Sequence, residues 1–205
     1  MIQNSRILIG LTGGISTGKS TVSNIIIEKG YPLIDADKIA RKVVEIDKPA
    51  YIKIMKEFGE NILLEDKSID RKALGNIVFN NKERLERLNN IVHPYIFEYI
   101  KLQIDRLSLN NPIIFLDIPL LFEQYDLWKR FNIKFDEIWL VYLDSDTQME
   151  RLMKRDGISK EEALSRMKSQ MDINYKRTRS SKIIDNSGDV EYLKIQIDKL
   201  LSELI

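Results

Sequence analysis

The feature that most constrains this chain is a glycine-rich segment near its start, Gly13-Gly14-Ile15-Ser16-Thr17-Gly18-Lys19-Ser20-Thr21. It fits the pattern of a glycine, four free positions, a second glycine, a lysine, and a serine or threonine. The glycines let backbone N–H groups turn toward a phosphate chain at close range. The Lys19 ammonium then meets the outer phosphates, and the Ser20 hydroxyl can ligate Mg²⁺. We therefore expect a nucleotide-binding phosphate loop, called the P-loop below.

The residues on either side of the P-loop support this interpretation. Ile7-Leu8-Ile9 is typical of a short buried strand. After the loop, an apolar helical face with a glycine stop is formed by Val22, Ile25, Ile26 and Gly30. The N-terminus of that helix would point at the phosphates, and a helix N-terminus favours anions. The sequence predicts a strand, loop and helix unit built around phosphate.

Composition limits the class of protein. A chain of 205 residues suits one α/β domain with insertions, or two small domains. It has no cysteine, which excludes disulfides and thiolate metal sites and fits a reducing compartment. Its formal charge is +1, so no overall field attracts nucleic acid or a membrane surface. We expect a soluble cytoplasmic protein with neither nucleic acid nor membrane as partner.

A carboxylate pair follows the second predicted strand. Residues 31–34 are typical of a strand, which runs into Asp35-Ala36-Asp37. Asp37 has two interpretations. It could cap a helix over residues 38–46, or it could be a functional carboxylate beyond the carboxyl end of a parallel strand, where α/β folds bind ligands. The local sequence does not separate them.

The next sixty residues have helical spacing. We expect one helix from Pro49 to Gly59, another over residues 69–79, and a longer one from Glu83 that the proline of His93-Pro94 should break or kink. The block over residues 38–110 is predicted to be a helical acceptor-binding insertion. His93 is the only histidine, and a lone histidine is more often a structural hydrogen-bonding group than a catalyst.

The third predicted strand, residues 112–117, closes on Asp117. An apolar strand ending in aspartate is the usual partner of a P-loop and holds Mg²⁺ directly or through water. The segment Pro119-Leu120-Leu121-Phe122-Glu123 is expected to line the cleft next to the acceptor. A fourth strand is predicted over residues 136–143.

The helix after that strand carries Gln148, Arg151 and Arg155 on one face. They form either a solvated basic stripe or, because phosphoryl transfer needs cations over the transferring group, part of a closing lid. Asp156-Gly157 predicts a turn, and the run from Ser159 to Glu162 predicts a capping box. The following helix should bury Ala163, Leu164, Met167 and Met171. We assign residues 145–175 to a lid.

The last part of the chain completes the predicted core. Lys176-Arg177-Thr178-Arg179 is typical of a solvated turn, residues 182–185 of a strand, and residues 190–205 of an amphipathic helix. The turn Asn186-Ser187-Gly188 lies where a nucleotide base would rest in such a fold. The nucleotide-binding core is then predicted to comprise residues 1–37, 111–144 and 176–205.

Taken in order, these motifs resemble the dephospho-CoA kinase family along almost the whole chain. The resemblance rests on Leu11-Thr12-Gly13-Gly14-Ile15, Asp35-Ala36-Asp37 with Arg41, His93-Pro94, Pro119-Leu120-Leu121-Phe122-Glu123, the run Gln148, Arg151 and Arg155, Arg166 with Gln170, and Ile184-Asp185-Asn186-Ser187-Gly188. The chain departs from the family pattern at Ser16-Thr17, where a glycine and a small residue are usual, and at Ser181, where an acidic residue is common.

The resemblance implies an α/β P-loop kinase core with a parallel five-stranded sheet flanked by helices, a helical acceptor-binding insertion and a helical lid. It implies transfer of the ATP γ-phosphoryl group to the ribose 3′-hydroxyl of dephospho-CoA, the last step of coenzyme A synthesis. By resemblance the catalytic residues are Lys19, Asp37 as the base, and Arg151 as a lid cation. The implied ATP-binding residues are Gly14, Ile15, Ser16, Thr17, Gly18, Lys19, Ser20, Thr21, Arg155, Asn186 and Gly188. The implied acceptor-binding residues are Asp37, Arg41, His93, Leu120 and Glu123, and the Mg²⁺ residues are Ser20 and Asp117.

Three other functions share parts of this pattern. A nucleoside monophosphate kinase or other small-molecule kinase has the same core and lid, so the acceptor region would separate it. A GTP-dependent switch needs an Asn-Lys-x-Asp motif, and the nearest match, Asn81-Lys82-Glu83-Arg84, lacks the aspartate. A nucleotide-sensing module would bind without turnover. The sequence leaves the oligomeric state open.

Overall fold

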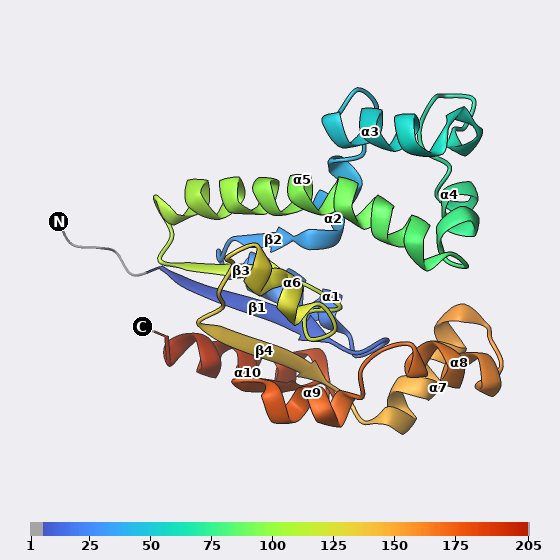
Figure 1. Cartoon of the computed structure of the whole chain (residues 1–205). Coiled ribbons are helices and arrows are strands. Elements are labelled where there is room, and N and C mark those ends of the chain that lie inside the picture. Colours follow the sequence, from blue (N-terminus) through green and yellow to red (C-terminus); the bar gives the residue numbers. More distant parts are fainter. Residues whose placement is uncertain (1–5, 205) are drawn as a thin grey trace. The chain divides into compact units, whose positions relative to one another are not determined.

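The computed structural model describes residues 6–204 as an α/β fold around one five-stranded sheet (Figure 1). The strand order is β2-β3-β1-β4-β5. β1 pairs in parallel with both β3 and β4, and β4 pairs in parallel with β5. The strands are β1 Ile7–Gly13, β2 Leu33–Asp35, β3 Ile113–Asp117, β4 Glu137–Tyr142 and β5 Lys182–Asp185. The predicted fold class, a parallel five-stranded sheet flanked by helices, is confirmed.

The helices connect these strands and fill the insertion between β2 and β3. They are α1 Lys19–Glu28, α2 Ala36–Lys42, α3 Pro49–Phe58, the 3₁₀ turn η1 Glu60–Ile62, α4 Arg71–Val78, α5 Lys82–Ser108, α6 Tyr125–Arg130, α7 Ser145–Asp156, α8 Lys160–Lys168, α9 Ile173–Arg179 and α10 Val190–Ser202. The chain divides into two compact units. The first, the sheet unit, runs up to residue 34 and resumes at 107, and the second, the helical unit, contains residues 35–106.

The core of the sheet unit lies where β1, β3 and β4 pack against α1 and α10. Its members are fully or almost fully buried apolar side chains, among them Ile9, Leu11, Val22, Ile26, Phe115, Trp139, Ile184 and Ile197. Phe115 and Trp139 meet edge to face with ring centroids 5.2 Å apart. Each such side chain contributes about 1.5–3 kcal/mol on burial, so the strands form a stiff support for the loops at their carboxyl ends.

The helical unit has a smaller core of its own, formed by Ile54, Ile62, Leu74 and Val78. α3 begins with Pro49 at its first position and ends at Gly59, whose φ of 80° only glycine adopts without strain, as the sequence predicts. α4 begins two residues later than expected because the Asp70 carboxylate accepts the N–H groups of Lys72 and Ala73 and so caps it.

Pro94 does not end its helix, so of the two outcomes expected at this proline, a break or a kink, the break is wrong. α5 continues through Pro94 as one helix of 27 residues (Figure 1). Proline removes one backbone hydrogen bond, whereas the turns that follow bury an apolar stripe of Phe97, Ile100 and Ile104. The buried stripe favours continuing the helix.

Several expectations for the chain after β3 need correction. Residues 125–130 form α6, which the sequence did not suggest. Residues 176–179 are the end of α9 and not a turn. In α8 only Ala163 is fully buried, Leu164 is 38% exposed, and the helix ends at Lys168, before Met171.

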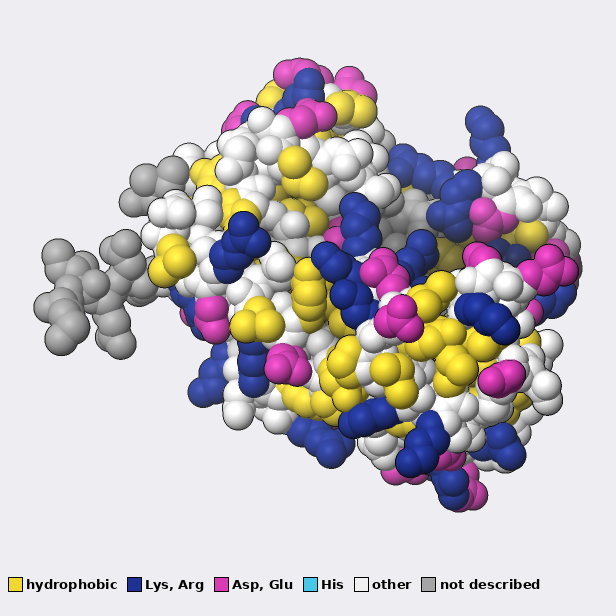
Figure 2. All heavy atoms as spheres, turned by 90° about the horizontal axis from the view of Figure 1, so that it is seen from above, with side chains coloured by type: hydrophobic (Ala, Val, Ile, Leu, Met, Phe, Trp, Pro, Cys, Tyr) yellow, Lys and Arg dark blue, Asp and Glu magenta, His cyan; other side chains and the backbone are white. Residues whose placement is uncertain are grey.

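Basic and acidic side chains are mixed on the face drawn in Figure 2, in keeping with a net charge of +1.

Candidate active site

The P-loop connects the carboxyl end of β1 to the start of α1. α1 begins at Lys19, directly after Gly18, whose φ is +82°. A side chain at position 18 would be strained by this backbone, and its Cβ would lie 2.1 Å from Nδ2 of Asn186. Glycine is therefore required at position 18 for two reasons: the backbone there has a positive φ, and the Asn186 side chain leaves no room for a Cβ. Ser16 also has a positive φ, 58°, which costs a non-glycine residue energy and is typical of functional loops.

A cavity of about 720 Å³ opens in front of the P-loop. It is formed by the P-loop, the last turns of α7 and the segment that follows β5. Of the expected ATP-binding residues, those that line it are Gly14, Ser16, Thr17, Gly18, Lys19, Ser20, Thr21, Arg155, Asn186 and Gly188, and Arg151 lines it as well. Ile15 lines instead a neighbouring cavity of about 370 Å³, bounded by α8 and the segment before α9. The fold thus brings residues more than 160 positions apart to one cavity of the size usual for a small-molecule site.

Lys19, which lines this cavity, forms an ion pair with Asp117 at the end of β3. Asp117 is 7% exposed, and its second oxygen accepts the Ser23 hydroxyl at 2.7 Å. The Ser23 oxygen also lies 3.0 Å from the Lys19 carbonyl oxygen, so its one proton can be donated to either acceptor. A buried carboxylate is stable only when it is paired and hydrogen-bonded, and both conditions hold here. The expected juxtaposition of Asp117 with the P-loop is present, and Ser23 is a member of the site that sequence reasoning missed.

Side chains from the C-terminal part of the chain hold the P-loop backbone at alternate residues. The Lys176 ammonium donates to the Gly13 carbonyl at 3.2 Å. The Ile15 N–H donates to Oε1 of Gln170 at 2.9 Å, and Nδ2 of Asn186 donates to the Thr17 carbonyl at 2.7 Å. These bonds hold the loop backbone at three points.

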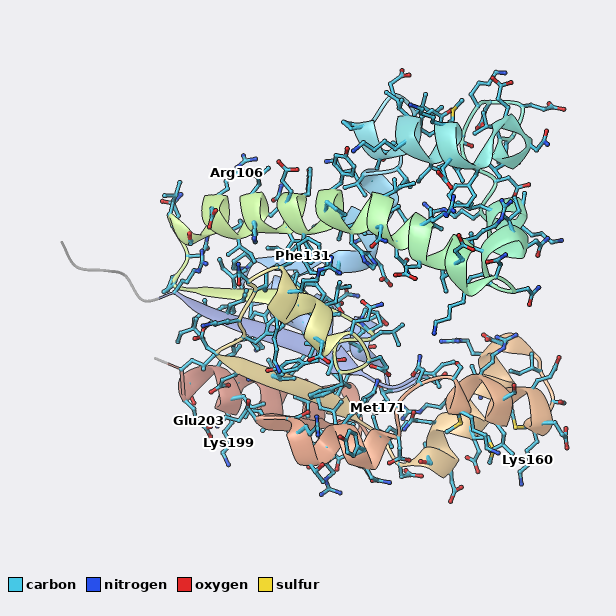
Figure 3. All side chains as sticks on the ribbon, viewed as in Figure 1. Arg106, Phe131, Lys160, Met171, Lys199 and Glu203 are labelled. Carbon is cyan, nitrogen blue, oxygen red and sulfur yellow. The ribbon has the colours of Figure 1, made fainter. Side chains whose placement is uncertain are left out.

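Lys176 corrects the expectation of a solvated basic turn. Its side chain is fully buried, and its ammonium lies 2.7 Å from Oε1 of Glu123. The same Glu123 oxygen accepts the N–H of Met171, which Figure 3 labels in the segment between α8 and α9. Neighbouring Arg177 and Arg179 are exposed, so only one residue of the basic cluster enters the interior.

The face of α7 that carries Gln148, Arg151 and Arg155 runs from buried to exposed. Gln148 is 2% exposed and donates to the Leu143 carbonyl at 2.6 Å. Arg151 donates to the backbone carbonyl of Asn186 at 3.1 Å, which places its guanidinium at the cavity wall. It is therefore not part of a purely solvated stripe.

Arg155 and Arg166 meet at one carboxylate where α7 turns into α8. Arg155 donates to Asp156 at 2.8 Å, and Arg166 donates to it at 2.7 Å. The hydrogen bond from Arg155 and, after it, the charge of Arg166 hold the pKa of Asp156 below its ordinary value. Gly157 then ends α7 with a φ of 65°, and the predicted capping box of Ser159 and Glu162 starts α8.

The helical unit holds three more of the expected site residues, Asp37, Arg41 and His93, whereas Leu120 follows β3 in the sheet unit. Asp35 caps α2 by accepting the Lys38 N–H at 2.9 Å, so the interpretation of Asp37 as the cap is wrong. Asp37 is exposed in the first turn of α2, and Arg41 is exposed in its last turn.

His93 is half-buried on α5. It lines a cavity of about 200 Å³ within the helical unit, together with Arg71, Asn89 and apolar side chains. Its ring lies edge to face with Phe97, with centroids 6.3 Å apart. A cavity with an apolar wall and a few polar groups is the usual form of a small-molecule subsite.

Carboxylates and histidines do not gather into a metal cage in residues 6–204, where no three of the side chains His, Cys, Asp or Glu form a group that could hold an ion. None of the helices described is long and apolar enough to cross a membrane.

A model of the protein family described as dephospho-CoA kinase matches residues 7–191, which is most of the chain. This chain belongs to the dephospho-CoA kinase family. It is 46% identical over 197 residues to the dephospho-CoA kinase of Carboxydothermus hydrogenoformans, a match that covers 96% of this chain and 93% of the relative.

Two solved structures agree with this family membership. The dephospho-CoA kinase from Campylobacter jejuni superposes with a TM-score of 0.66 at 32% identity and 97% coverage of both chains. A protein from Thermus thermophilus superposes with a TM-score of 0.81 at 34% identity and 98% coverage of both. The family resemblance stated from the motifs is confirmed, and the chain is a kinase.

Sequence reasoning missed two site residues, Ser23 and Lys176, and the sequence contains a signal for only one of them. Ser23 lies one helical turn after Lys19, so its position beside the P-loop lysine could have been inferred from the helix period. Lys176 stands in a run of basic residues, and nothing in that run distinguishes the buried lysine from its exposed neighbours.

Proposed function

We propose that this chain transfers the γ-phosphoryl group of ATP to the ribose 3′-hydroxyl of dephospho-CoA and releases ADP and coenzyme A. The observation that carries the proposal is the cavity in which the P-loop, Lys19 and Arg151 converge, in a chain that belongs to the family over nearly its whole length. ATP is the proposed donor, and the reaction is the last step of coenzyme A synthesis. A cytoplasmic location is part of the proposal and fits a chain without cysteine.

The P-loop supplies the phosphate site. Its backbone N–H groups and the N-terminus of α1 favour the negative charge of the triphosphate. Lys19 and Arg151, which both line the cavity, would balance the charge that gathers on the γ-phosphoryl oxygens during transfer. Preorganised cations of this kind act most strongly where water is excluded. Arg155, Asn186 and Gly188 would complete the ATP site, the last two near the adenine.

Mg²⁺ fits the oxygen donors at this site. Mg²⁺ prefers hard oxygen ligands and usually binds through one or two protein groups together with substrate phosphates. Ser20 lines the cavity, and the Asp117 carboxylate pairs with Lys19, which lines the cavity as well. Ser20 would ligate the ion, and Asp117, through its position beside Lys19, would hold it directly or through water. When bound, the ion neutralises phosphate charge.

The chemistry needs one proton acceptor from the protein. The 3′-hydroxyl oxygen forms a bond to the γ-phosphorus while the bond from that phosphorus to the bridging oxygen of ADP breaks. Asp37 would take the hydroxyl proton as general base. Its carboxylate is exposed and is not the cap of α2, so it is accessible to an acceptor.

The acceptor is proposed to bind through the helical block, residues 38–110, with Arg41 and His93 as contacts. Leu120 and Glu123, which follow β3 in the sheet unit, are proposed contacts as well. Residues 145–175, with α7 and α8, are proposed to act as a lid that brings Arg151 to the transferring group.

An acceptor panel tests the proposed function. Purified protein is given ATP and Mg²⁺ with dephospho-CoA, AMP, adenosine or shikimate, and ADP release and the phosphorylated product are measured. We expect dephospho-CoA to be phosphorylated far faster than the others. A faster reaction with AMP or shikimate would contradict the proposed acceptor and favour another small-molecule kinase. ATP binding with no turnover on any acceptor would favour a nucleotide-sensing module.

The same assay tests the P-loop. Lys19→Ala should lower kcat about a hundred- to a thousandfold, because a preorganised cation is worth roughly 3–4 kcal/mol in the transition state. Near-wild-type turnover in a folded Lys19→Ala protein would contradict the assignment of the loop.

A further inference from the structure

The proposed reaction gives no role to Lys176, the one side chain in its basic run that enters the interior. Taking an ammonium out of water is costly unless it is paired and hydrogen-bonded. Within the described residues, its ammonium lies 2.7 Å from Oε1 of Glu123 and 3.2 Å from the Gly13 carbonyl. The fold therefore buries a charged side chain next to the P-loop even though its desolvation is unfavourable.

A hydrogen bond to the Gly13 carbonyl constrains one particular peptide of the P-loop. Gly13 is the last residue of β1, and its C=O shares one planar peptide with the N–H of Gly14. Because the two groups of a trans peptide point in opposite directions, a donor that fixes the carbonyl also fixes where the Gly14 N–H points. Gly14 lines the phosphate cavity. The Lys176 ammonium thus sets the orientation of the first peptide of the P-loop.

Glu123 connects this contact to the segment after α8. The oxygen that pairs with Lys176 also accepts the Met171 N–H at 2.9 Å. The residue before it, Gln170, accepts the Ile15 N–H of the P-loop. The other Glu123 oxygen is buried and has no hydrogen-bond partner among the described residues, so Lys176 is the cation that compensates this carboxylate.

We propose that Lys176 is a positioning residue for phosphoryl transfer: it orients the Gly13–Gly14 peptide toward the nucleotide phosphates and, through Glu123, ties that peptide to the segment that follows α8. The inference rests on the proposed function for its phosphate ligand. It assigns Glu123 a role toward the P-loop in addition to its proposed contact with the acceptor.

Three variants separate positioning from simple structural support. Lys176→Met keeps the length of the side chain but removes both the charge and the donor. Glu123→Gln with Lys176→Met removes both charges, so no uncompensated ion stays buried, yet the Gly13 carbonyl still lacks its donor. Arg177→Met, at the exposed neighbouring position, is the matched control. Tm, the ATP dissociation constant by calorimetry, kcat and both KM values are measured for each.

We expect Lys176→Met to lower Tm and to lower kcat about 10- to 100-fold, because small misplacements of a phosphate-binding group cost rates of this order. The double variant should recover most of the lost Tm while kcat and ATP affinity stay low. Arg177→Met should resemble the wild type.

Two results would overturn the proposal. One is a double variant that recovers kcat and ATP affinity together with Tm, since the pair would then be structural only. The other is a folded Lys176→Met protein with wild-type kcat and ATP affinity. ATP affinity is measured without an acceptor, so a wrong acceptor assignment would leave this test intact.

Discussion

The carboxylate of Asp35 accepts the backbone N–H of Lys38 at 2.9 Å and thereby caps α2. Asp37, two residues further on, lies exposed in the first turn of the same helix. Two aspartates that look equivalent in the sequence thus have different positions. The cap belongs to Asp35, and the proposed general base is Asp37.

Asp37→Asn should therefore lower kcat without changing stability. Asparagine keeps the size and most hydrogen bonds of aspartate but cannot accept the proton of the 3′-hydroxyl. General-base catalysis typically contributes about 10²–10⁴ in rate, so kcat should fall within that range. The measurement is kcat for dephospho-CoA phosphorylation together with Tm.

Asp35→Ala is the matched control for that variant. Loss of an N-cap costs about 0.5–2 kcal/mol of stability, so Tm should fall in Asp35→Ala and stay unchanged in Asp37→Asn. Full kcat in Asp37→Asn would leave the family assignment in place and remove Asp37 as the base.

Arg151→Ala should lower kcat and kcat/KM together, with little change in the KM for ATP. A cation that acts mainly on the transferring group loses transition-state binding and not ground-state binding. A loss of about a hundredfold or more is expected from removal of one such group. Lys154→Ala, an exposed basic residue on the same helix, is the control and should keep wild-type rates. A rise in KM alone would make Arg151 a ground-state binding residue.

Gly18→Ala should abolish ATP binding. The φ of +82° strains any L-residue there, and the new Cβ would lie 2.1 Å from Nδ2 of Asn186, so the bond from Asn186 to Thr17 must shift. Gly30→Ala has a similar φ of +85° but no atom within 4 Å of the new Cβ. It should cost about 1–2 kcal/mol of stability and keep ATP affinity. Equal ATP affinities in the two variants would show that contact with Asn186 is unimportant.

The junction of α7 and α8 should lose stability in acid. Arg155, and after it Arg166, hold the pKa of Asp156 below its ordinary value of 3.8. A carboxylate with a lowered folded-state pKa stabilises the fold above its ordinary pKa, and this contribution is lost as the pH falls through the lowered value. Asp156→Asn should lower Tm by about 1–3 °C near neutral pH, and the difference from wild type should shrink as the pH falls below 3.8 and vanish once the pH is below the lowered pKa of Asp156.

Glu150→Gln, at an exposed carboxylate on α7, controls for the general effect of removing a negative charge. A difference in Tm between Asp156→Asn and the wild type that stays constant from neutral to acidic pH would contradict the role of the arginines.

Much of the fold could be predicted because its signals are local. The P-loop glycines, the strand ending in Asp117, the glycine after α3 and the capping box of Ser159 each act over one or two turns of chain. Local spacing left two points open that the structure decides. Helix α5 continues through Pro94, and Asp35, not Asp37, caps α2. In both, the outcome depends on burial or on a choice between near-equivalent neighbours, which spacing alone does not decide.

By itself, then, the sequence determined a P-loop kinase core, because the backbone conformations and helix starts it needs are set by residues next to one another. Only the tertiary structure decided which charges the site uses. The buried Lys176 donates to the Gly13 carbonyl, which is 163 positions away in the sequence. Asn186 donates to the Thr17 carbonyl, which is 169 positions away. Whether a lysine is solvated or buried depends on whether folding supplies such a partner and removes the water around it, and no short run of residues records either.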